Sequence, residues 1–131
     1  MAYKVTNWEN IETRSKAASQ VFTAKEFVGN DGTGGIIPSA PATVVEGIVL
    51  ENVLASDVDF ATTRRIAIEV PSKNVDLYRA EVTNGPAVAA MEGSTFDVDA
   101  ADASKIDVGG AGTQFMITAI ISETEVEFKF V

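Results

Sequence analysis

The feature that most constrains the fold of this chain is a predicted β-hairpin over residues 114–131. A nearly all-apolar stretch, 114–122, leads through a short polar turn into a stretch, 125–131, in which apolar and charged residues alternate. Successive side chains of a strand point to opposite faces, so strict alternation predicts a strand with one buried face. The residues expected on that face are Val126, Phe128 and Phe130. Such a hairpin is typical of a compact β-domain, and its residue types favour a scaffold or binding role over catalysis.

Short β-rich segments with turn residues between them continue through most of the chain. Residues 43–50 form a β-branched segment with a predicted bulge at Gly47, and residues 65–82 are expected to be one hairpin with its turn at 71–74. No internal repeat and no long helix is evident. The pattern predicts an all-β, mainly antiparallel fold, a small β-sandwich or β-barrel.

The first forty-two residues differ from the rest because their apolar residues are scattered and a glycine-rich stretch, 29–35, interrupts them. We therefore divide the chain into an extended or irregular N-terminal arm, 1–42, and a β-domain, 43–131. In this interpretation Trp8, Phe22 and Phe27 are anchors that dock on a neighbouring molecule or on the body. The alternative is that they pack on the body as an irregular N-terminal strand or loop.

Composition excludes several kinds of chemistry. The chain has no cysteine and no histidine. Disulfides, thiolate catalysis and cysteine-based metal sites are therefore excluded, and the commonest general base is missing. We expect no enzyme, no catalytic residue, no cofactor and no metal. The first eight residues lack the apolar core of a secretory signal, and no apolar run approaches the roughly 20 residues that span a bilayer, so we expect no export and no membrane partner.

The net charge of −9 is unevenly placed. Residues 1–40 hold four basic and four acidic residues, whereas residues 41–131 hold six and fifteen. An acidic body repels phosphate backbones, so we expect no nucleic-acid partner. The adjacent pair Arg64-Arg65 either meets an acidic surface of a partner or forms ion pairs with the chain's own carboxylates; we favour the second.

Two further groups of residues are candidate ligand sites. Asp97, Asp99 and Asp102 lie close together, as calcium ligands do, but the spacing lacks the glycine and glutamate of an EF-hand loop. The glycine-rich stretches 29–35 and 109–112 lack the flanking residues of phosphate-binding loops. Solvent-exposed carboxylates and flexible connections explain both groups better.

The whole pattern resembles a known class of proteins. A small acidic β-domain without cysteine or histidine follows a neutral N-terminal segment, and segments 84–88, 92–98, 112–118 and 126–131 carry the likeness. In these respects the chain resembles the capsid decoration, or cement, proteins and related small virion proteins of tailed bacteriophages. The resemblance covers roughly residues 43–131.

The resemblance implies a structural protein on the exterior of the virion, made in the host cytoplasm. Such proteins bind the outer surface of the capsid, often as homotrimers, and clamp neighbouring major capsid subunits. An N-terminal arm would contribute through strand addition, with avidity over many sites. The residues expected to anchor or support this arm on the partner are Trp8, Val21, Phe22, Phe27, Ile36 and Ile37.

Two other functions fit the same sequence features. One is another virion part, such as a tail-tube, head-completion or fibre-base protein, which shares a β-fold without catalytic chemistry. The other is a non-catalytic ligand-binding β-module, which would need exposed aromatic side chains on a rigid face. Trp8, Tyr3 and Tyr78 are the candidates for such a face.

Overall fold

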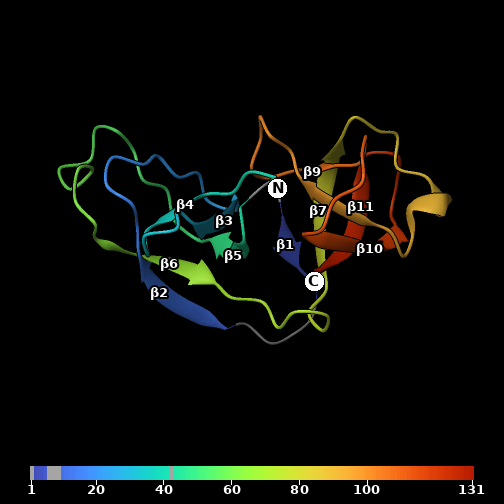
Figure 1. Ribbon diagram of the computed structural model, residues 1–131, viewed down its shortest axis with the longest axis horizontal. Coiled ribbons are helices and arrows are strands. Elements are labelled where there is room, and N and C mark those ends of the chain that lie inside the picture. The colour runs from blue at the N-terminus through green and yellow to red at the C-terminus, as the bar shows by residue number, and fades with distance from the viewer. Residues whose placement is uncertain (1, 6–9, 42) are drawn as a thin grey trace.

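The computed structural model describes residues 2–5, 10–41 and 43–131, and it confirms an all-β, mainly antiparallel fold. Figure 1 shows the strands in two groups that lie side by side. Within the described residues the elements are β1 (Tyr3–Lys4), β2 (Ile11–Ser15), β3 (Phe27–Asn30), β4 (Ile36–Pro38), β5 (Val45–Val49), β6 (Arg65–Glu69), β7 (Tyr78–Thr83), the short 3-10 helix η1 (Ala89–Met91), β8 (Thr95–Val98), β9 (Ile106–Asp107), β10 (Phe115–Ile120) and β11 (Glu125–Phe130).

The C-terminal group of strands closes into a small barrel. Its strand order is β1-β7-β11-β10-β8-β9, and β9 pairs back onto β7 in parallel. The predicted terminal hairpin is confirmed, because β10 and β11 pair from Phe115↔Phe130 to Ile120↔Val126, with a register shift between Ile117 and Ala119. We call this unit the C-terminal barrel.

The N-terminal group closes in the same way. Its order is β2-β6-β5-β3-β4, and the residue after β2, Lys16, forms a parallel bridge with Ile36 of β4. The register of β3 and β5 shifts beside Gly47, where the sequence predicts a bulge. The predicted hairpin over 65–82 is wrong: β6 pairs with β2 and β5, whereas β7 pairs in the other barrel. Its turn residues instead connect the two barrels.

The two barrels share one topology, which the sequence does not reveal. When the five strands of each barrel are numbered along the chain, from β2 to β6 and from β7 to β11, both barrels have the strand order 1-5-4-2-3. In both, the third strand also pairs in parallel with the first and so closes the barrel. The first and fifth strands also agree in register, because the pairs Ser15↔Arg65 and Glu81↔Glu125 occupy equivalent positions. In both fifth strands the second and fourth residues are buried and the first and third are not.

The described part of the predicted arm contributes strands to the N-terminal barrel. Strands β2, β3 and β4 all lie before residue 42, and they pair across that boundary, β3 with β5 and β2 with β6. The short strand β1 adds to β7 of the other barrel. Residues 6–9, which include Trp8, lie outside the described residues.

A core of aromatic rings joins the barrels. Phe27 of β3 packs among Phe115, Phe128 and Phe130 of the C-terminal barrel, with ring centroids 4.5 to 5.9 Å away. Val45 and Ile48 belong to the same core. A second core fills the N-terminal barrel; it consists of Phe22, Val28, Ile36, Val49, Val53, Ile66 and Ile68. One face of the N-terminal sheet thus covers the C-terminal barrel while the other encloses its own core.

Polar contacts also cross between the barrels. Lys4 Nζ lies 3.2 Å from Asp76 and 3.7 Å from Glu69, and all three side chains are largely buried. Gln114 donates hydrogen bonds to the carbonyls of Thr43 and Ala40. Its side-chain oxygen accepts one from the Val98 N–H. The contacts of Lys4 with Glu69 and of Gln114 with the Ala40 and Thr43 carbonyls form only when the barrels are together, so they fix the relative orientation of the two barrels.

Candidate functional site

The predicted partner-binding residues lie in different environments. Three of them, Phe22, Phe27 and Ile36, are at most 1% exposed because they belong to the two cores of this chain. For Phe22 and Phe27 this agrees with the alternative in which the aromatic residues pack on the body. In this conformation they are not accessible to a partner. Val21 is 47% exposed, and Ile37 is partly exposed on β4. Among the described members of the predicted set, Val21 and Ile37 therefore reach the surface.

The connection between β5 and β6, residues 50–64, is the largest difference between the two barrels. The equivalent connection in the C-terminal barrel, residues 121–124, is only a short turn. Loops of this length without strands or helices are commonly functional. Successive turns build it, with Asp57 N–H bonded to the Leu54 carbonyl and Phe60 N–H to the Asp57 carbonyl. The Asp57 carboxylate also accepts a hydrogen bond from the Leu54 N–H.

A buried lysine holds this loop from inside the barrel. Lys16 is fully buried, and its Nζ donates hydrogen bonds of 2.8 Å to the Phe60 carbonyl and 2.6 Å to the Thr62 carbonyl. The same nitrogen lies 5.8 Å from the centroid of the Phe60 ring. A buried ammonium group must have hydrogen-bond acceptors. The loop therefore supplies those acceptors, and its backbone is fixed in return.

Ion pairs brace the loop from outside. Arg64 forms ion pairs of 2.8 Å with both Glu51 and Asp59. For Arg64, this agrees with the prediction that the Arg64-Arg65 pair binds the chain's own carboxylates. The hydrogen bond to Glu51 raises the pKa of Arg64. Burial opposes ionisation of Glu51, but hydrogen bonds from the Ala67 N–H and from Arg64 outweigh it and lower the pKa of Glu51.

The braced loop presents apolar side chains to solvent. Leu54 is 53% exposed and Val58 is fully exposed. Val21 lies beside Leu54, because the bridge Phe22↔Val53 makes the preceding and following residues cross-strand neighbours. We call Val21, Leu54 and Val58 the apolar tip. Apolar side chains held outward on a fixed backbone are suited to contact another protein.

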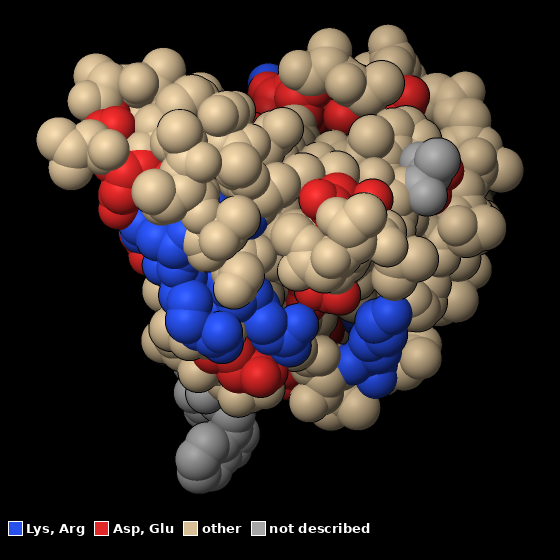
Figure 2. Space-filling view, turned by 60° about the vertical axis from the view of Figure 1, so that its left-hand side comes forward, with Lys and Arg blue, Asp and Glu red and all other residues tan. Residues whose placement is uncertain are grey.

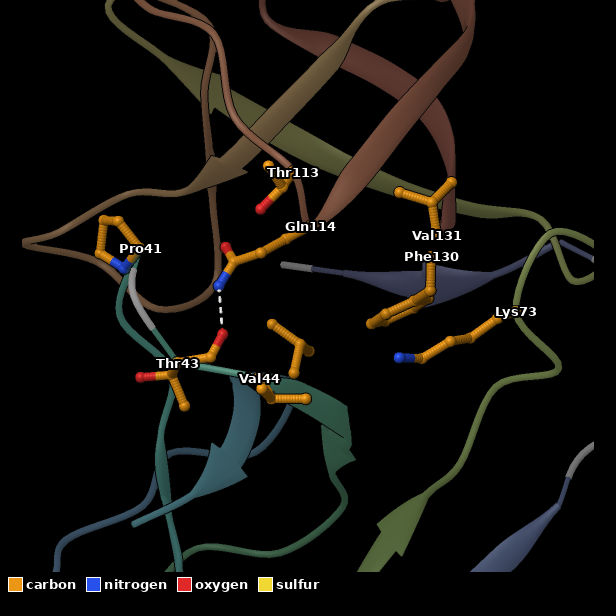
Figure 3. Close-up of a pocket in the computed structure, with 9 residues that line it drawn as sticks. Pro41, Thr43, Val44, Lys73, Thr113, Gln114, Phe130 and Val131 are labelled. Atoms are coloured by element: carbon orange, nitrogen blue, oxygen red, sulfur yellow. Dashed lines mark hydrogen bonds between the residues drawn. The ribbon is translucent and has the colours of Figure 1, made fainter. Parts of the chain in front are cut away.

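A shallow pocket marks the junction of the barrels. It has a volume of about 300 Å³ and is lined from both barrels, by Thr43 and Val44 on one side and Thr113 and Gln114 on the other. Figure 3 shows Gln114 reaching across it to Thr43, with Lys73 and Phe130 on the opposite wall. Tyr78, a candidate for a ligand-binding face, is fully buried, whereas Tyr3 is 42% exposed.

The aspartate cluster has structural partners. Asp97 accepts hydrogen bonds from the Thr113 and Gln114 N–H groups. Asp99 accepts one from the Thr83 hydroxyl. Hydrogen bonds from Ser104 lower the pKa of Asp102. In the described part of the chain no group of three acidic side chains is arranged to hold a metal ion. These carboxylates thus shape the loops that they belong to.

No protein-family model matches the chain, and no curated protein matches it in sequence. Within the described residues, no helix has the length and apolar character that crossing a membrane requires.

Sequence reasoning identifies Val21 but misses the other two members of the apolar tip. The available signal is local: Leu54 and Val58 are apolar residues inside a polar, turn-rich stretch between two strands. The importance of Lys16 has no local signal, because its burial depends on carbonyls more than forty residues away in the sequence.

Proposed function

We propose that this chain is a non-catalytic structural virion protein that binds the outer surface of a phage capsid and stabilises contacts between major capsid subunits. The proposal rests on the resemblance of its sequence to capsid decoration proteins. Self-association as a homotrimer and a position on the capsid exterior belong to the same proposal. Fold alone does not specify function, so the contact surface must carry the argument.

The observation that carries the proposal is the apolar tip. The loop that bears Leu54 and Val58 is held by the buried Lys16 and by Arg64, so a partner need not order it on binding. Contact surfaces that are ordered in advance lose less entropy when they bind. A modest contact of this kind is sufficient on a shell, because a lattice of sites multiplies weak affinity through avidity.

The chain's acidic character suits repeated binding on a lattice. A net charge of −9 keeps the free protein soluble before it reaches the shell. On the shell, the apolar tip supplies the attraction to the capsid surface, against the repulsion between neighbouring acidic copies. Val21, one of the residues expected to anchor the arm, is part of this surface; it lies in the loop between β2 and β3, which is bridged to the 50–64 connection through Phe22 and Val53.

The experiment is co-sedimentation of the purified protein with expanded, undecorated shells from the same source. We expect saturation at a number of copies that matches the capsid subunits. A double variant, Leu54→Ser with Val58→Ser, should bind at least ten-fold more weakly. Val75→Ser is the matched control, because Val75 is 68% exposed and lies outside the loop. No binding by the wild type, or equal binding by the double variant, contradicts the proposal.

A second candidate is the ligand-binding β-module, which the junction pocket favours. Its volume of about 300 Å³ is at the lower limit of small-molecule sites. Lys73 is the charged side chain among its lining residues. In this function a small ligand would raise the melting temperature of the wild type, and a bulky substitution at Val44 would abolish that increase.

A further inference from the structure

The repeat of one topology places two equivalent strand edges in the molecule. In the C-terminal barrel one edge of β7 pairs with β11, and the end of its other edge pairs with β9. The start of that other edge, before β9, pairs with β1. Tyr3 pairs with Arg79 and Lys4 with Tyr78, and the Val5 N–H donates to the Leu77 carbonyl at 2.7 Å. An extended segment thus completes this edge of the barrel.

The equivalent edge of the N-terminal barrel belongs to β2. The closing bridge Lys16↔Ile36 corresponds to the pair Val82↔Ile106. Because Lys16 is equivalent to Val82, the residues before them correspond one by one. Ile11 is therefore equivalent to Leu77, and Thr13 to Arg79. Among the described residues no strand lies on this side of β2.

The backbone groups of this edge face outward. The Asn10 carbonyl accepts from Val70 N–H and the Lys16 N–H donates to the Arg64 carbonyl, so the even-numbered residues of β2 bond to β6. In an antiparallel pair the intervening residues point the other way. The N–H and carbonyl groups of Ile11 and Thr13 are therefore directed at the position that β1 occupies on β7.

One side chain covers this edge. Arg65 donates from Nη2 to the Thr13 carbonyl at 2.6 Å and from Nε to the Thr13 hydroxyl at 2.9 Å. Arg65 is exposed, and within the described part of the chain it forms no ion pair, although the protein has nineteen carboxylate side chains. Figure 2, which brings forward the left-hand side of the view in Figure 1, shows basic side chains gathered on this side of the molecule with acidic side chains beside them.

We propose that the edge of β2 over Ile11–Thr13 is a docking site for one extended strand of the capsid subunit that this chain decorates. This inference rests on the proposed function and adds how the partner is held. The partner's strand pairs antiparallel with β2, as β1 pairs with β7. Arg65 releases the Thr13 carbonyl and binds a carboxylate of the incoming strand. Exposed edges readily accept such strands, and a charged side chain over the edge protects it meanwhile.

Charge complementarity selects the occupant. The guanidinium of Arg65 now bonds to neutral oxygens, and a carboxylate is a stronger acceptor for its planar donors. In the register about Glu12 a second copy would bring two Glu12 side chains opposite each other, which is unfavourable, whereas the register about Thr13 would set Glu12 opposite Arg14; the need of Arg65 for a carboxylate therefore carries the choice of occupant. A strand of different sequence, with an acidic residue facing Arg65 and an apolar residue facing Ile11, avoids this repulsion.

The test uses the full-length protein and undecorated shells as the probe. Thr13→Pro removes an N–H that does not bond to β6, and Arg65→Glu reverses the charge at the edge. Both variants should bind shells at least ten-fold more weakly than the wild type. Lys129→Glu makes the same charge change on β11 of the C-terminal barrel, where Lys129 is partly exposed, and should bind normally. Unchanged unfolding midpoints show that each variant is folded.

A second measurement holds even if Thr13→Pro unfolds. Hydrogen exchange of the wild type on shells should slow at the Ile11 and Thr13 amides, which are directed away from β6 in the free chain. Wild-type binding without this protection, or normal binding by Arg65→Glu, overturns the docking site and leaves the proposed function intact. Failure of the wild type to bind shells overturns both.

Discussion

Replacing Lys16 with methionine tests whether the buried ammonium group fixes the 50–64 loop. Methionine has nearly the same length and fills the same space, so the substitution isolates the loss of the charge and its hydrogen bonds. The Phe60 carbonyl keeps one partner, the Ser19 N–H at 2.9 Å, whereas the Thr62 carbonyl loses the bond of 2.6 Å from Lys16. We expect the loop to loosen and the whole barrel to lose stability.

The magnitude follows from two opposing effects. Each hydrogen bond from a charged donor contributes roughly 1.5–3 kcal/mol, so the two short bonds together contribute about 3–6 kcal/mol. Removing the ammonium group also removes the unfavourable free energy of burying it, which offsets part of this loss. Because the Thr62 carbonyl loses its charged donor at a partly buried position, we expect a net loss of about 2–4 kcal/mol in the free energy of unfolding.

The assay combines thermal unfolding with hydrogen exchange. For a chain of this size each kcal/mol corresponds to about 3–5 °C, so the Tm of Lys16→Met should fall by roughly 6–20 °C. Amides in the 54–63 segment should exchange faster than in the wild type. Lys73→Met is the control, because Lys73 is exposed. A Tm and loop exchange equal to those of the wild type would refute the idea that Lys16 holds the loop.

Three further predictions concern the fold. A methyl group on Gly47 would overlap the Glu69 carbonyl, so Gly47→Ala should lower the free energy of unfolding by about 1–3 kcal/mol in urea titration, and an unchanged midpoint would refute the close approach. Phe27→Ala should cost about 3–5 kcal/mol, because Phe27 is fully buried in the aromatic core that joins the two barrels; a loss below 1 kcal/mol would contradict this. Since the pKa of Glu51 is lowered in the folded state, its contribution is present above its ordinary value of 4.5 and is lost as the pH falls through the folded pKa. Glu51→Gln should therefore show a shallower loss of stability on acidification than the wild type, and equal slopes would contradict the assignment.

Local patterns predicted those parts of the fold that depend on neighbouring residues. The β10–β11 hairpin is evident from alternation and a short turn, and the bulge beside Gly47 follows from one glycine in a β-branched strand. The pairing of β6 was mispredicted because the turn residues after it resemble a hairpin turn. In the structure they connect two barrels, and no local property distinguishes these two uses.

Long-range closure explains what the sequence could not indicate. Strand β3 has a small apolar run between polar loops, and only its pairing with β5 shows that Phe27 belongs to a core. The repeated topology is likewise hidden, because equivalent positions such as Lys16 and Val82 differ completely in chemistry. Two barrels can share strand order and register while sharing little sequence, since each position needs only a suitable pattern of burial.

The apolar tip was partly predictable. Val21 is an exposed apolar residue in both the sequence interpretation and the structure. Leu54 and Val58 became candidates only when the second barrel showed how short the equivalent connection can be. Comparison between the two halves of one chain thus provided the reference that similar proteins would otherwise provide.

The most direct test of the central claim is the thermal stability of undecorated shells with and without this protein. A protein that clamps neighbouring capsid subunits binds the intact shell better than the dissociated subunits, so mass action must stabilise the shell. We predict that shells saturated with the wild type dissociate at a higher temperature in calorimetry, and that the double variant at Leu54 and Val58 gives little increase. An unchanged dissociation temperature for shells that carry the bound wild type would contradict a stabilising role.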